Sequence, residues 1–180
     1  TLFTDARYLE AAEKRLVPLG VKVETLSKEN KPELYLKKYK SVAVPFSEIS
    51  YAEFLTLQQS GAKFYDATNA LRECAKVKTE GELNSISRAC EIAEEGLTKT
   101  LGEIKEGMTE REVAAILEHE MRAFGADGTS FDTIVAFGAG AAVPHHETGD
   151  TRLKFGDEIL IDFGCKTQGY CSDMTRTFLF

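Results

Sequence analysis

The amino-acid sequence predicts a mixed α/β (α+β) fold built from two consecutive parts. In residues 1–71, short segments with the period-two alternation of strands are interleaved with segments of helical period. Two longer amphipathic segments follow, and each begins with a helix-capping sequence. The chain ends in two segments rich in strand-forming residues, 158–164 and 169–180. These observations predict an α/β part, followed by a part in which helices precede an antiparallel hairpin.

The composition argues against several classes of protein. Of the 180 residues, 43% are hydrophobic, which excludes a disordered or collagen-like chain. The chain has 22 Lys and Arg residues against 29 Asp and Glu residues, a net charge of -7, and its basic residues form no long block. Because nucleic-acid binding needs a cationic surface, we expect no nucleic-acid partner. The longest apolar runs fall far short of the roughly 20 residues of a spanning helix, so we expect no membrane segment.

The cysteines and the N-terminus point to a reducing compartment. Cys74, Cys90, Cys165 and Cys171 form no CxxC pair, so we expect reduced thiols and neither a disulfide framework nor a zinc site. The N-terminus lacks the charged and apolar regions of a signal peptide, which favours a cytoplasmic protein. The chain begins without Met and ends inside a predicted strand, so we expect it to be part of a longer protein.

Each element of the first part has a local signal. A helix that begins after Asp5 must end before Pro18, which cannot continue it. Gly61 closes a later helix over residues 50–60. The remaining elements are strands at residues 21–26, 41–45 and 63–65 and a helix at 31–39. Such alternation is typical of a parallel sheet, and we place the boundary between two domains, 1–71 and 72–180, after it.

Two capping boxes mark the helices of the second part. In each box a Thr and a Glu three residues later can satisfy each other's backbone N–H groups, Thr79 with Glu82 and Thr109 with Glu112. Apolar residues then recur at helical spacing, which predicts one buried face on each helix. The predicted faces consist of Leu83, Ile86, Cys90, Ala93 and Leu97 on the first helix and of Val113, Leu117, Met121 and Phe124 on the second.

Two aspartates in the terminal hairpin are candidates for chemistry. Asp162 interrupts the apolar strand 158–164, and Asp173 lies in the strand that follows. A turn at Thr167 and Gln168 would place Asp162 directly opposite Asp173. Like charges in such a pair are destabilising unless a cation lies between them. Because carboxylate oxygens suit Mn, Mg or Co, the pair predicts a divalent-metal site.

A simpler interpretation of the two aspartates stays open at this point. Both could be solvated or paired with a neighbour such as Arg176. A one-residue bulge at Gly169 would also put the two carboxylates on opposite faces of the hairpin. The metal site therefore depends on the register of the hairpin.

A pair of histidines follows a stretch rich in Gly and Ala, 135–143, along which the backbone can approach a ligand closely. Because imidazole changes charge near neutral pH, His145 is a candidate proton donor in catalysis. His146 is more simply explained as a solvated loop residue. A serine nucleophile lacks support because no GxSxG motif is present, and no cysteine stands near a histidine in sequence.

A resemblance to a known family rests on three segments, PHHETGD (144–150), EILIDFG (158–164) and GYCSDMTRTF (169–178). They resemble the Xaa-Pro peptidases, the aminopeptidase P and prolidase branch of the pita-bread metallopeptidases. The resemblance extends to TDARY (4–8), GMTE (107–110) and SFDTIVAFG (130–138). It implies part of a creatinase-like N-terminal α/β domain over residues 1–71, followed by the first half of a pita-bread catalytic domain over residues 72–180.

The resemblance also implies roles for individual residues. Asp162 and Asp173 match the first two metal ligands of the family, and His145 matches its active-site histidine. The family completes a site for two divalent metal ions with a histidine and two glutamates, and no residue of this chain matches them. Mn is the metal that we expect, with Co or Zn as alternatives.

By this resemblance, the intact protein would hydrolyse the bond before proline in peptide substrates, as an aminopeptidase or a dipeptidase, and would be a homodimer. The 180 residues alone would be inactive. The alternative is a non-catalytic pita-bread module that binds peptides or proteins, because some relatives have lost their metals. The presence of Asp162, Asp173 and His145 counts against this alternative.

Overall fold

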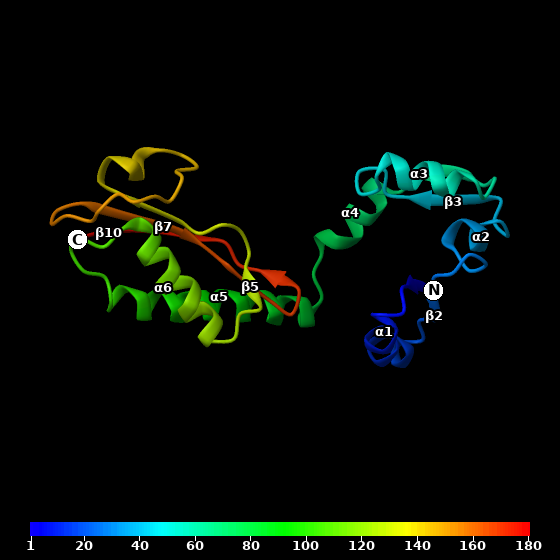
Figure 1. Cartoon of the computed structure of the whole chain (residues 1–180), viewed down its shortest axis with the longest axis horizontal. Coiled ribbons are helices and arrows are strands. Elements are labelled where there is room, and N and C mark those ends of the chain that lie inside the picture. Colours follow the sequence, from blue (N-terminus) through cyan, green and yellow to red (C-terminus); the bar gives the residue numbers. More distant parts are fainter. The chain divides into compact units, whose positions relative to one another are not determined.

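The computed structural model describes residues 1–180. The chain divides into two compact units, Thr1–Val77 and Lys78–Phe180, and each is described by itself (Figure 1). None of its helices combines the length and the apolar character needed to cross a membrane.

The first unit alternates short strands with helices. Its strands form two parallel pairs, β1 with β2 and β3 with β4, and a helix connects the strands of each pair. The alternation and the parallel pairing predicted from the sequence are therefore both present. The elements are β1 (Leu2–Thr4), α1 (Leu9–Leu16), a 3-10 turn (Val17–Leu19), β2 (Val23–Thr25), α2 (Pro32–Leu36), β3 (Ser41–Val44), α3 (Tyr51–Gln58), β4 (Lys63–Asp66) and α4 (Thr68–Lys76).

Packing in the first unit is shallow. Phe54 of α3 lies edge-on to Phe46 and Phe64, with ring centroids 5.4 and 5.5 Å apart. Even so, no apolar side chain of this unit is fully buried, and Phe46 is 44% exposed. All buried apolar side chains of the chain belong to the second unit.

Helix α4 crosses the boundary expected from the sequence. Residue 71 falls inside this helix, whereas the two compact units separate after Val77. No Gly or Pro lies between residues 67 and 79, so the sequence carries no local stop signal at either position.

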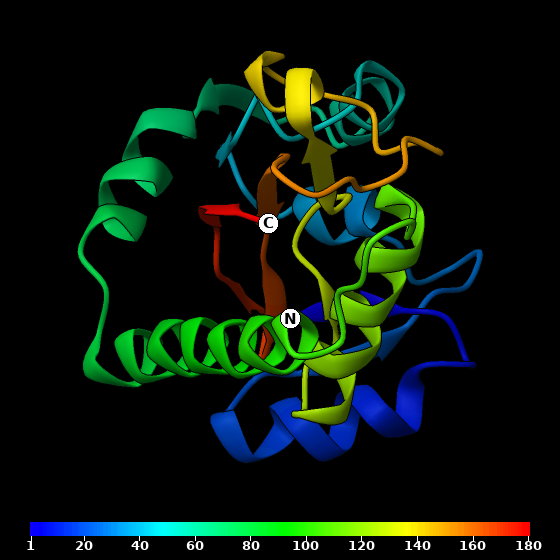
Figure 2. The same cartoon turned by 90° about the vertical axis from the view of Figure 1, so that its left-hand side faces the viewer.

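The second unit consists of two helices and two small antiparallel sheets. The main sheet has the order β10–β7–β6, and the smaller one has the order β5–β8–β9. The elements are α5 (Glu80–Leu101), α6 (Glu110–Ala123), β5 (Gly128–Thr129), β6 (Ile134–Phe137), a 3-10 turn (Gly138–Ala142), β7 (Glu158–Phe163), β8 (Cys165–Thr167), β9 (Tyr170–Cys171) and β10 (Met174–Leu179). Figures 1 and 2 show α5 on one side of the main sheet and the segment after β6 (yellow) on the other.

The core of this unit lies between the main sheet and the two helices. Along β7, Ile159, Ile161 and Phe163 are buried, whereas Leu160 and Asp162 are half-buried on the opposite face. Alternation along the strand thus separates a core face from an open face. The core face joins α5 and α6 in one cluster: Ala89, Ile92, Ala93, Leu97, Val113, Ala114, Leu117, Met121, Val135, Phe137, Leu153, Ile159, Ile161, Phe163 and Cys165.

The helix faces predicted from the sequence are confirmed on α6, where Val113, Leu117 and Met121 are buried, and in the C-terminal part of α5. Both helices begin with the predicted capping boxes. On α5, Ala93 and Leu97 are buried, but Leu83 is 53% exposed because the buried part of the helix begins at Ala89. A Cβ added at Gly96 would lie 2.8 Å from Met121 Cγ, so glycine permits the close approach of α5 to α6.

The terminal hairpin differs in register from the one predicted. Thr167 pairs with Tyr170 and Asp162 pairs with Thr175, so the prediction that Asp162 lies opposite Asp173 is wrong. The turn consists of Gln168 and Gly169, both in the left-handed region, with φ of 52° and 85°. A two-residue turn whose twist matches that of the strands requires this conformation at both positions.

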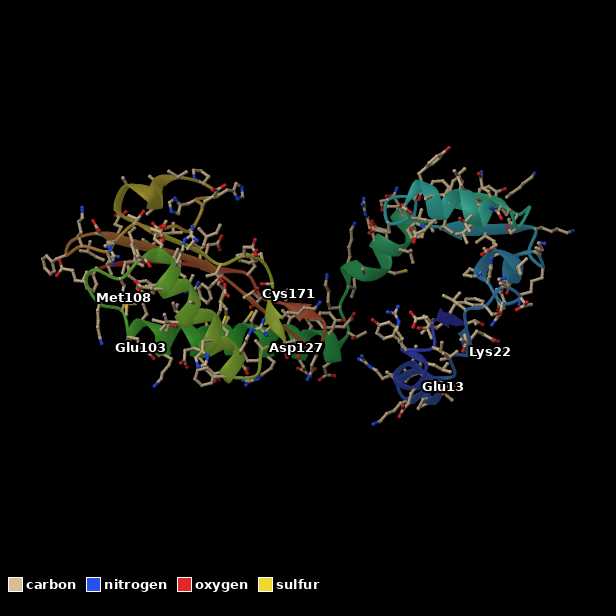
Figure 3. The ribbon with its side chains drawn as sticks, viewed as in Figure 1. Glu13, Lys22, Glu103, Met108, Asp127 and Cys171 are labelled. Atoms are coloured by element: carbon tan, nitrogen blue, oxygen red, sulfur yellow. The ribbon has the colours of Figure 1, made fainter.

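Asp127, which is labelled in Figure 3, stabilises the turn because its Oδ2 accepts a hydrogen bond from the Gln168 N–H at 3.0 Å. The sequence-based turn was centred one residue too early, which displaces the partner of Asp162 by two positions along the strand. A shift of two positions preserves the alternation of faces. Asp162 and Asp173 therefore occupy diagonal and not opposed positions of the hairpin.

Candidate active site

Asp162 lies on the open face of the main sheet. The hydroxyl of Thr175, its partner on β10, donates a hydrogen bond to Asp162 Oδ1 at 2.8 Å. The strand residues next to Asp162 are buried on the opposite face, so the carboxylate is half-buried and not enclosed in the core. Asp162 interrupts an apolar strand in the sequence, and the alternation of β7 places it on the face opposite the buried residues of that strand.

Asp173 lies between β9 and β10 and is exposed. The backbone before Asp173 lies very close to Gly164. A Cβ added at Gly164 would overlap Ser172 O and Ser130 Oγ. Ser130 Oγ donates to Ser172 O at 2.7 Å, and the Cys165 N–H donates to Ser172 Oγ at 3.1 Å. These bonds fix the backbone immediately before Asp173.

His145 lies in the loop that follows β6 and the 3-10 turn. Its φ of 53° is in the left-handed region, which is uncommon for a residue with a side chain. His145 and Asp162 line the same cavity, of about 250 Å³, together with His146, Thr175, Leu160, Ile134 and residues 141–144. The structure thus brings two of the three predicted site residues together, and Asp173 is not among the residues that line this cavity.

A buried carboxylate next to this cavity was missed by sequence reasoning. Glu110, the first residue of α6, is 0% exposed. Its Oε1 accepts a hydrogen bond from the Phe137 N–H at 3.1 Å, and its Oε2 accepts one from the Gly149 N–H at 2.8 Å. His146 Nε2 lies 3.0 Å from the same Oε2. A buried carboxylate without partners costs several kcal/mol, and these three partners offset that cost.

His146 was expected to be a solvated loop residue, but its side chain is only 19% exposed. In the tautomer with a hydrogen on Nε2, His146 donates to an ionised Glu110 carboxylate, which can only accept hydrogen bonds. A Cβ added at Gly140 would lie 3.1 Å from His146 Cε1, so the ring also packs tightly against the 3-10 turn. No local pattern indicates this contact, because Glu110 and His146 are 36 residues apart.

Backbone and side-chain bonds also fix the end of the loop. Thr148 Oγ1 accepts a hydrogen bond from the Val135 N–H at 2.9 Å and donates one to Thr133 O at 3.0 Å. The N–H groups of Glu110 and Arg111 each donate at 3.1 Å, to Thr151 O and Gly149 O. These bonds satisfy N–H groups at the start of α6 that have no partner inside the helix.

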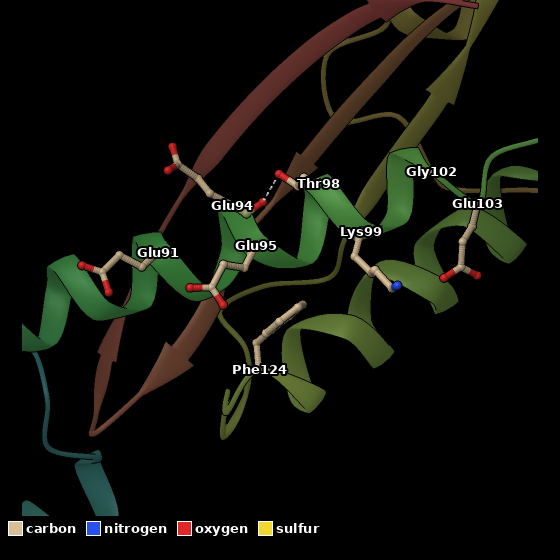
Figure 4. Close-up of a pocket in the computed structure, with 8 residues that line it drawn as sticks. All are labelled: Glu91, Glu94, Glu95, Thr98, Lys99, Gly102, Glu103 and Phe124. Atoms are coloured by element: carbon tan, nitrogen blue, oxygen red, sulfur yellow. Dashed lines mark hydrogen bonds between the residues drawn. The ribbon is translucent and has the colours of Figure 1, made fainter.

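A hollow larger than this cavity lies elsewhere in the second unit, along α5 and the end of α6 (Figure 4). It has a volume of about 640 Å³, and Glu91, Glu94, Glu95 and Glu103 are among its lining residues. Ion pairs engage three of these glutamates, since Arg88 lies 3.1 Å from Glu91 and 3.5 Å from Glu95, and Arg176 lies 3.3 Å from Glu94. None of the predicted site residues lines this hollow.

Cys165, the first residue of β8, is a core residue. Burial raises the pKa of the Cys165 thiol, and its Sγ lies 3.1 Å from Ala89 O. A thiol with a raised pKa is a poor nucleophile at neutral pH. The sequence, in which no cysteine stands near a histidine, likewise gives no support for a cysteine nucleophile.

The chain offers donor atoms of the type that a divalent metal ion prefers, but too few of them lie together to complete a site. Asp162 and Asp173 offer the carboxylate oxygens that hard divalent cations prefer. No group of three or more His, Cys, Asp or Glu side chains in the chain is arranged to hold a metal ion. The two aspartates therefore supply at most part of a coordination shell.

The chain matches known peptidases over nearly its whole length. Residues 84–180 match the model of metallopeptidase family M24. The chain is 35% identical over 176 residues to the Xaa-Pro dipeptidase of Pyrococcus horikoshii, a match that covers 97% of this chain and 49% of that protein. The chain spans about half the length of the curated relatives it matches.

Solved structures of peptidases are also similar to this chain over nearly its whole length. The X-Pro aminopeptidase of Thermotoga maritima has a TM-score of 0.91 and 35% identity, over 99% of this chain and 52% of that one. The prolidase of Pyrococcus furiosus has a TM-score of 0.88 and 31% identity, over 99% of this chain and 55% of that one. The expected resemblance and the α/β fold, with part of the pita-bread architecture of these enzymes, are confirmed. The chain belongs to metallopeptidase family M24.

Proposed function

We propose that the protein containing this chain is a metal-dependent peptidase that hydrolyses the bond before proline, as an Xaa-Pro aminopeptidase or dipeptidase. The observation that carries this proposal is the cavity on the open face of the sheet. There a family M24 chain presents an imidazole and a carboxylate, those of His145 and Asp162, to one small space. The preference for proline rests on the names of the relatives, an Xaa-Pro dipeptidase and an X-Pro aminopeptidase.

We assign Asp162 and Asp173 as ligands in a site for two divalent metal ions, with Mn as the first choice and Co or Zn as alternatives. Bound metal of this kind polarises a carbonyl group and activates water. The Thr175 hydroxyl occupies one lone pair of Asp162 Oδ1 and so orients the carboxylate, leaving Oδ2 and the other lone pairs available.

His145 has a different role in this proposal. Its imidazole stands at the cavity outside the proposed metal shell, where a ring N–H can donate a hydrogen bond to the substrate carbonyl as negative charge develops there. The same ring has the two nitrogen atoms that a general acid or base needs to give or take a proton. Loss of its side chain should therefore reduce the rate and leave the metal content unchanged.

The proposal is tested on the intact protein with Asp162→Asn and His145→Ala, assayed on Xaa-Pro dipeptides, longer Xaa-Pro peptides and matched peptides without proline. Asp162→Asn should abolish hydrolysis and lower the metal content, because a neutral amide is a poor ligand for a hard cation. Asp132→Asn, an exposed aspartate outside the cavity, is the matched control. Metal content is measured by mass spectrometry of the purified protein.

Several outcomes would contradict the proposal. Full activity and metal content in Asp162→Asn would remove Asp162 from the site. Equal hydrolysis of peptides without proline would remove the substrate preference. Peptide binding without hydrolysis or metal in the intact protein would support the non-catalytic module instead.

A further inference from the structure

We propose that Glu110 and His146 are positioning residues for His145, and we call this pair the Glu110–His146 clasp. The inference rests on the proposed function, since it assigns a task to residues around the same cavity. Glu110 does not line the cavity, whereas His146 does, and the role proposed for both is to hold His145 and not to act on substrate or metal. Both act by fixing the loop of residues 138–149, on which His145 stands.

The first argument is the distribution of the partners of Glu110. Its carboxylate contacts the loop at three points: the Phe137 N–H immediately before it, His146 Nε2 within it and the Gly149 N–H at its end. Glu110 itself is the first residue of α6, a helix whose face is packed into the core. One fully buried carboxylate therefore ties both ends and the middle of the loop to a rigid element.

The second argument is the conformation of His145. A residue with a side chain remains in the left-handed region only where its surroundings over-determine the backbone. His145 has a φ of 53°, and the next residue is the one whose ring is fixed between Glu110 and Gly140. Because His146 directly follows His145, fixing the His146 ring also constrains the backbone of His145. That backbone determines where the His145 side chain lies at the cavity.

The third argument is that Glu110 has a matched counterpart that lacks these contacts. Glu80 is the first residue of α5, follows a capping threonine in the same way and is exposed. The position in the helix therefore does not by itself bury a glutamate. The loop and its histidines account for the difference.

The decisive experiment is a double-mutant cycle in the intact protein. His146→Ala alone should lower kcat about tenfold with a change in KM below about threefold, because the loop would no longer place His145 for the transition state. In a His145→Ala background the same change should cost less than about twofold, because the residue being positioned is already gone. His146→Gln should recover most of the rate, since the Gln amide nitrogen can take the place of Nε2.

A second measurement does not depend on activity. Hydrogen-exchange mass spectrometry of peptides that span residues 133–151 should show faster exchange in Glu110→Gln, because a Gln side chain has one acceptor oxygen where Glu has two and leaves either the Phe137 or the Gly149 N–H without its acceptor. Glu80→Gln is the matched control and should change neither exchange in this segment nor activity.

The outcomes separate the inference from the proposed function. Equal losses from His146→Ala in both backgrounds, or unchanged exchange in Glu110→Gln, would overturn the clasp as a positioning device. A parent protein inactive on every peptide would overturn the proposed function and with it the catalytic part of this inference. The exchange measurement would still decide whether the clasp fixes the loop.

Discussion

Helices α5 and α6 begin with the same pattern, Thr-Glu-x-Glu, and both have a complete capping box. Their first residues nevertheless differ: Glu80 is exposed, whereas Glu110 is 0% exposed and accepts hydrogen bonds from two backbone amides. The cause lies outside the helices, in the loop that passes over the start of α6. A local pattern thus specifies where a helix begins, and the surrounding chain decides whether its first carboxylate is a solvated charge or part of a site.

The largest expected difference between the two helix starts is in stability. Glu110→Ala should lower the free energy of unfolding by about 3 kcal/mol or more, because it leaves buried N–H groups without acceptors and opens a cavity. Glu80→Ala should change it by less than about 0.5 kcal/mol, as is usual at an exposed position. Urea denaturation of both variants measures the difference, and equal losses would show that Glu110 contributes nothing beyond its place in the helix.

The capping threonines should differ less. Thr79→Ala and Thr109→Ala should each cost about 1 kcal/mol, since each removes a side-chain acceptor for a first-turn N–H. The larger loss should occur at Thr109, which is 8% exposed and pairs with Arg152 in a β-bridge. The same denaturation experiment checks the order, and a larger loss at Thr79 would mean that the loop does not reinforce the start of α6.

Acid should weaken both helix starts in the same way. Hydrogen bonds from the backbone N–H groups of Thr79 and Thr109 hold the pKa of Glu82 and of Glu112 below the ordinary value of a glutamate side chain. Because the folded-state pKa is lower, each carboxylate stabilises the fold above its unfolded pKa, and this contribution is lost as pH falls through the folded pKa.

The corresponding measurement is the melting temperature of the parent and of the double variant Glu82→Gln and Glu112→Gln between about pH 6 and about pH 3. The parent should lose more melting temperature on acidification than the variant, because only the parent has these carboxylates to protonate. A parallel decline in both proteins would assign the acid sensitivity to other groups.

The smallest effect is expected at an exposed ion pair between the start of α6 and the residue that follows the loop 138–149. Arg111 lies 3.3 Å from Asp150, and the two side chains are 66% and 83% exposed. Arg111→Ala should change the free energy of unfolding by less than about 0.5 kcal/mol and should leave kcat unchanged, because exposed ion pairs contribute little. A loss of rate comparable to that of His146→Ala would mean that surface charge, and not the buried clasp, fixes the loop.

The sequence predicted elements with strong local signals and missed features that depend on distant contacts. Capping residues mark helix starts, and Pro18 and Gly61 mark helix ends closely, since α1 ends at Leu16 and α3 at Gln58; in each case the physical cause lies within a few residues. Helix α4 was missed because no Gly or Pro lies between residues 67 and 79, and strand β6 was missed because it has only four residues, Ile134–Phe137.

The same distinction applies to the candidate site. The sequence identified His145 and Asp162, which line one cavity, but misplaced the partner of Asp162 because a turn centred one residue later moves the register by two positions. It had no means of finding the contact between Glu110 and His146. That contact joins residues 36 positions apart, and a glutamate at a helix start is as common on a surface as in a core.

The close packing of Gly164 against Ser172 and Ser130 has a consequence for laboratory evolution of this protein. Even one methyl group there would overlap both the Ser172 carbonyl and the Ser130 hydroxyl, so substitution would have to displace main chain and not merely a flexible side chain. In a library that varies every codon from 158 to 175 and is sorted for soluble expression, deep sequencing should recover glycine almost alone at position 164. The exposed Lys166 two codons further on should accept many replacements. Codon 164 is thus a fixed point around which such a library can be designed.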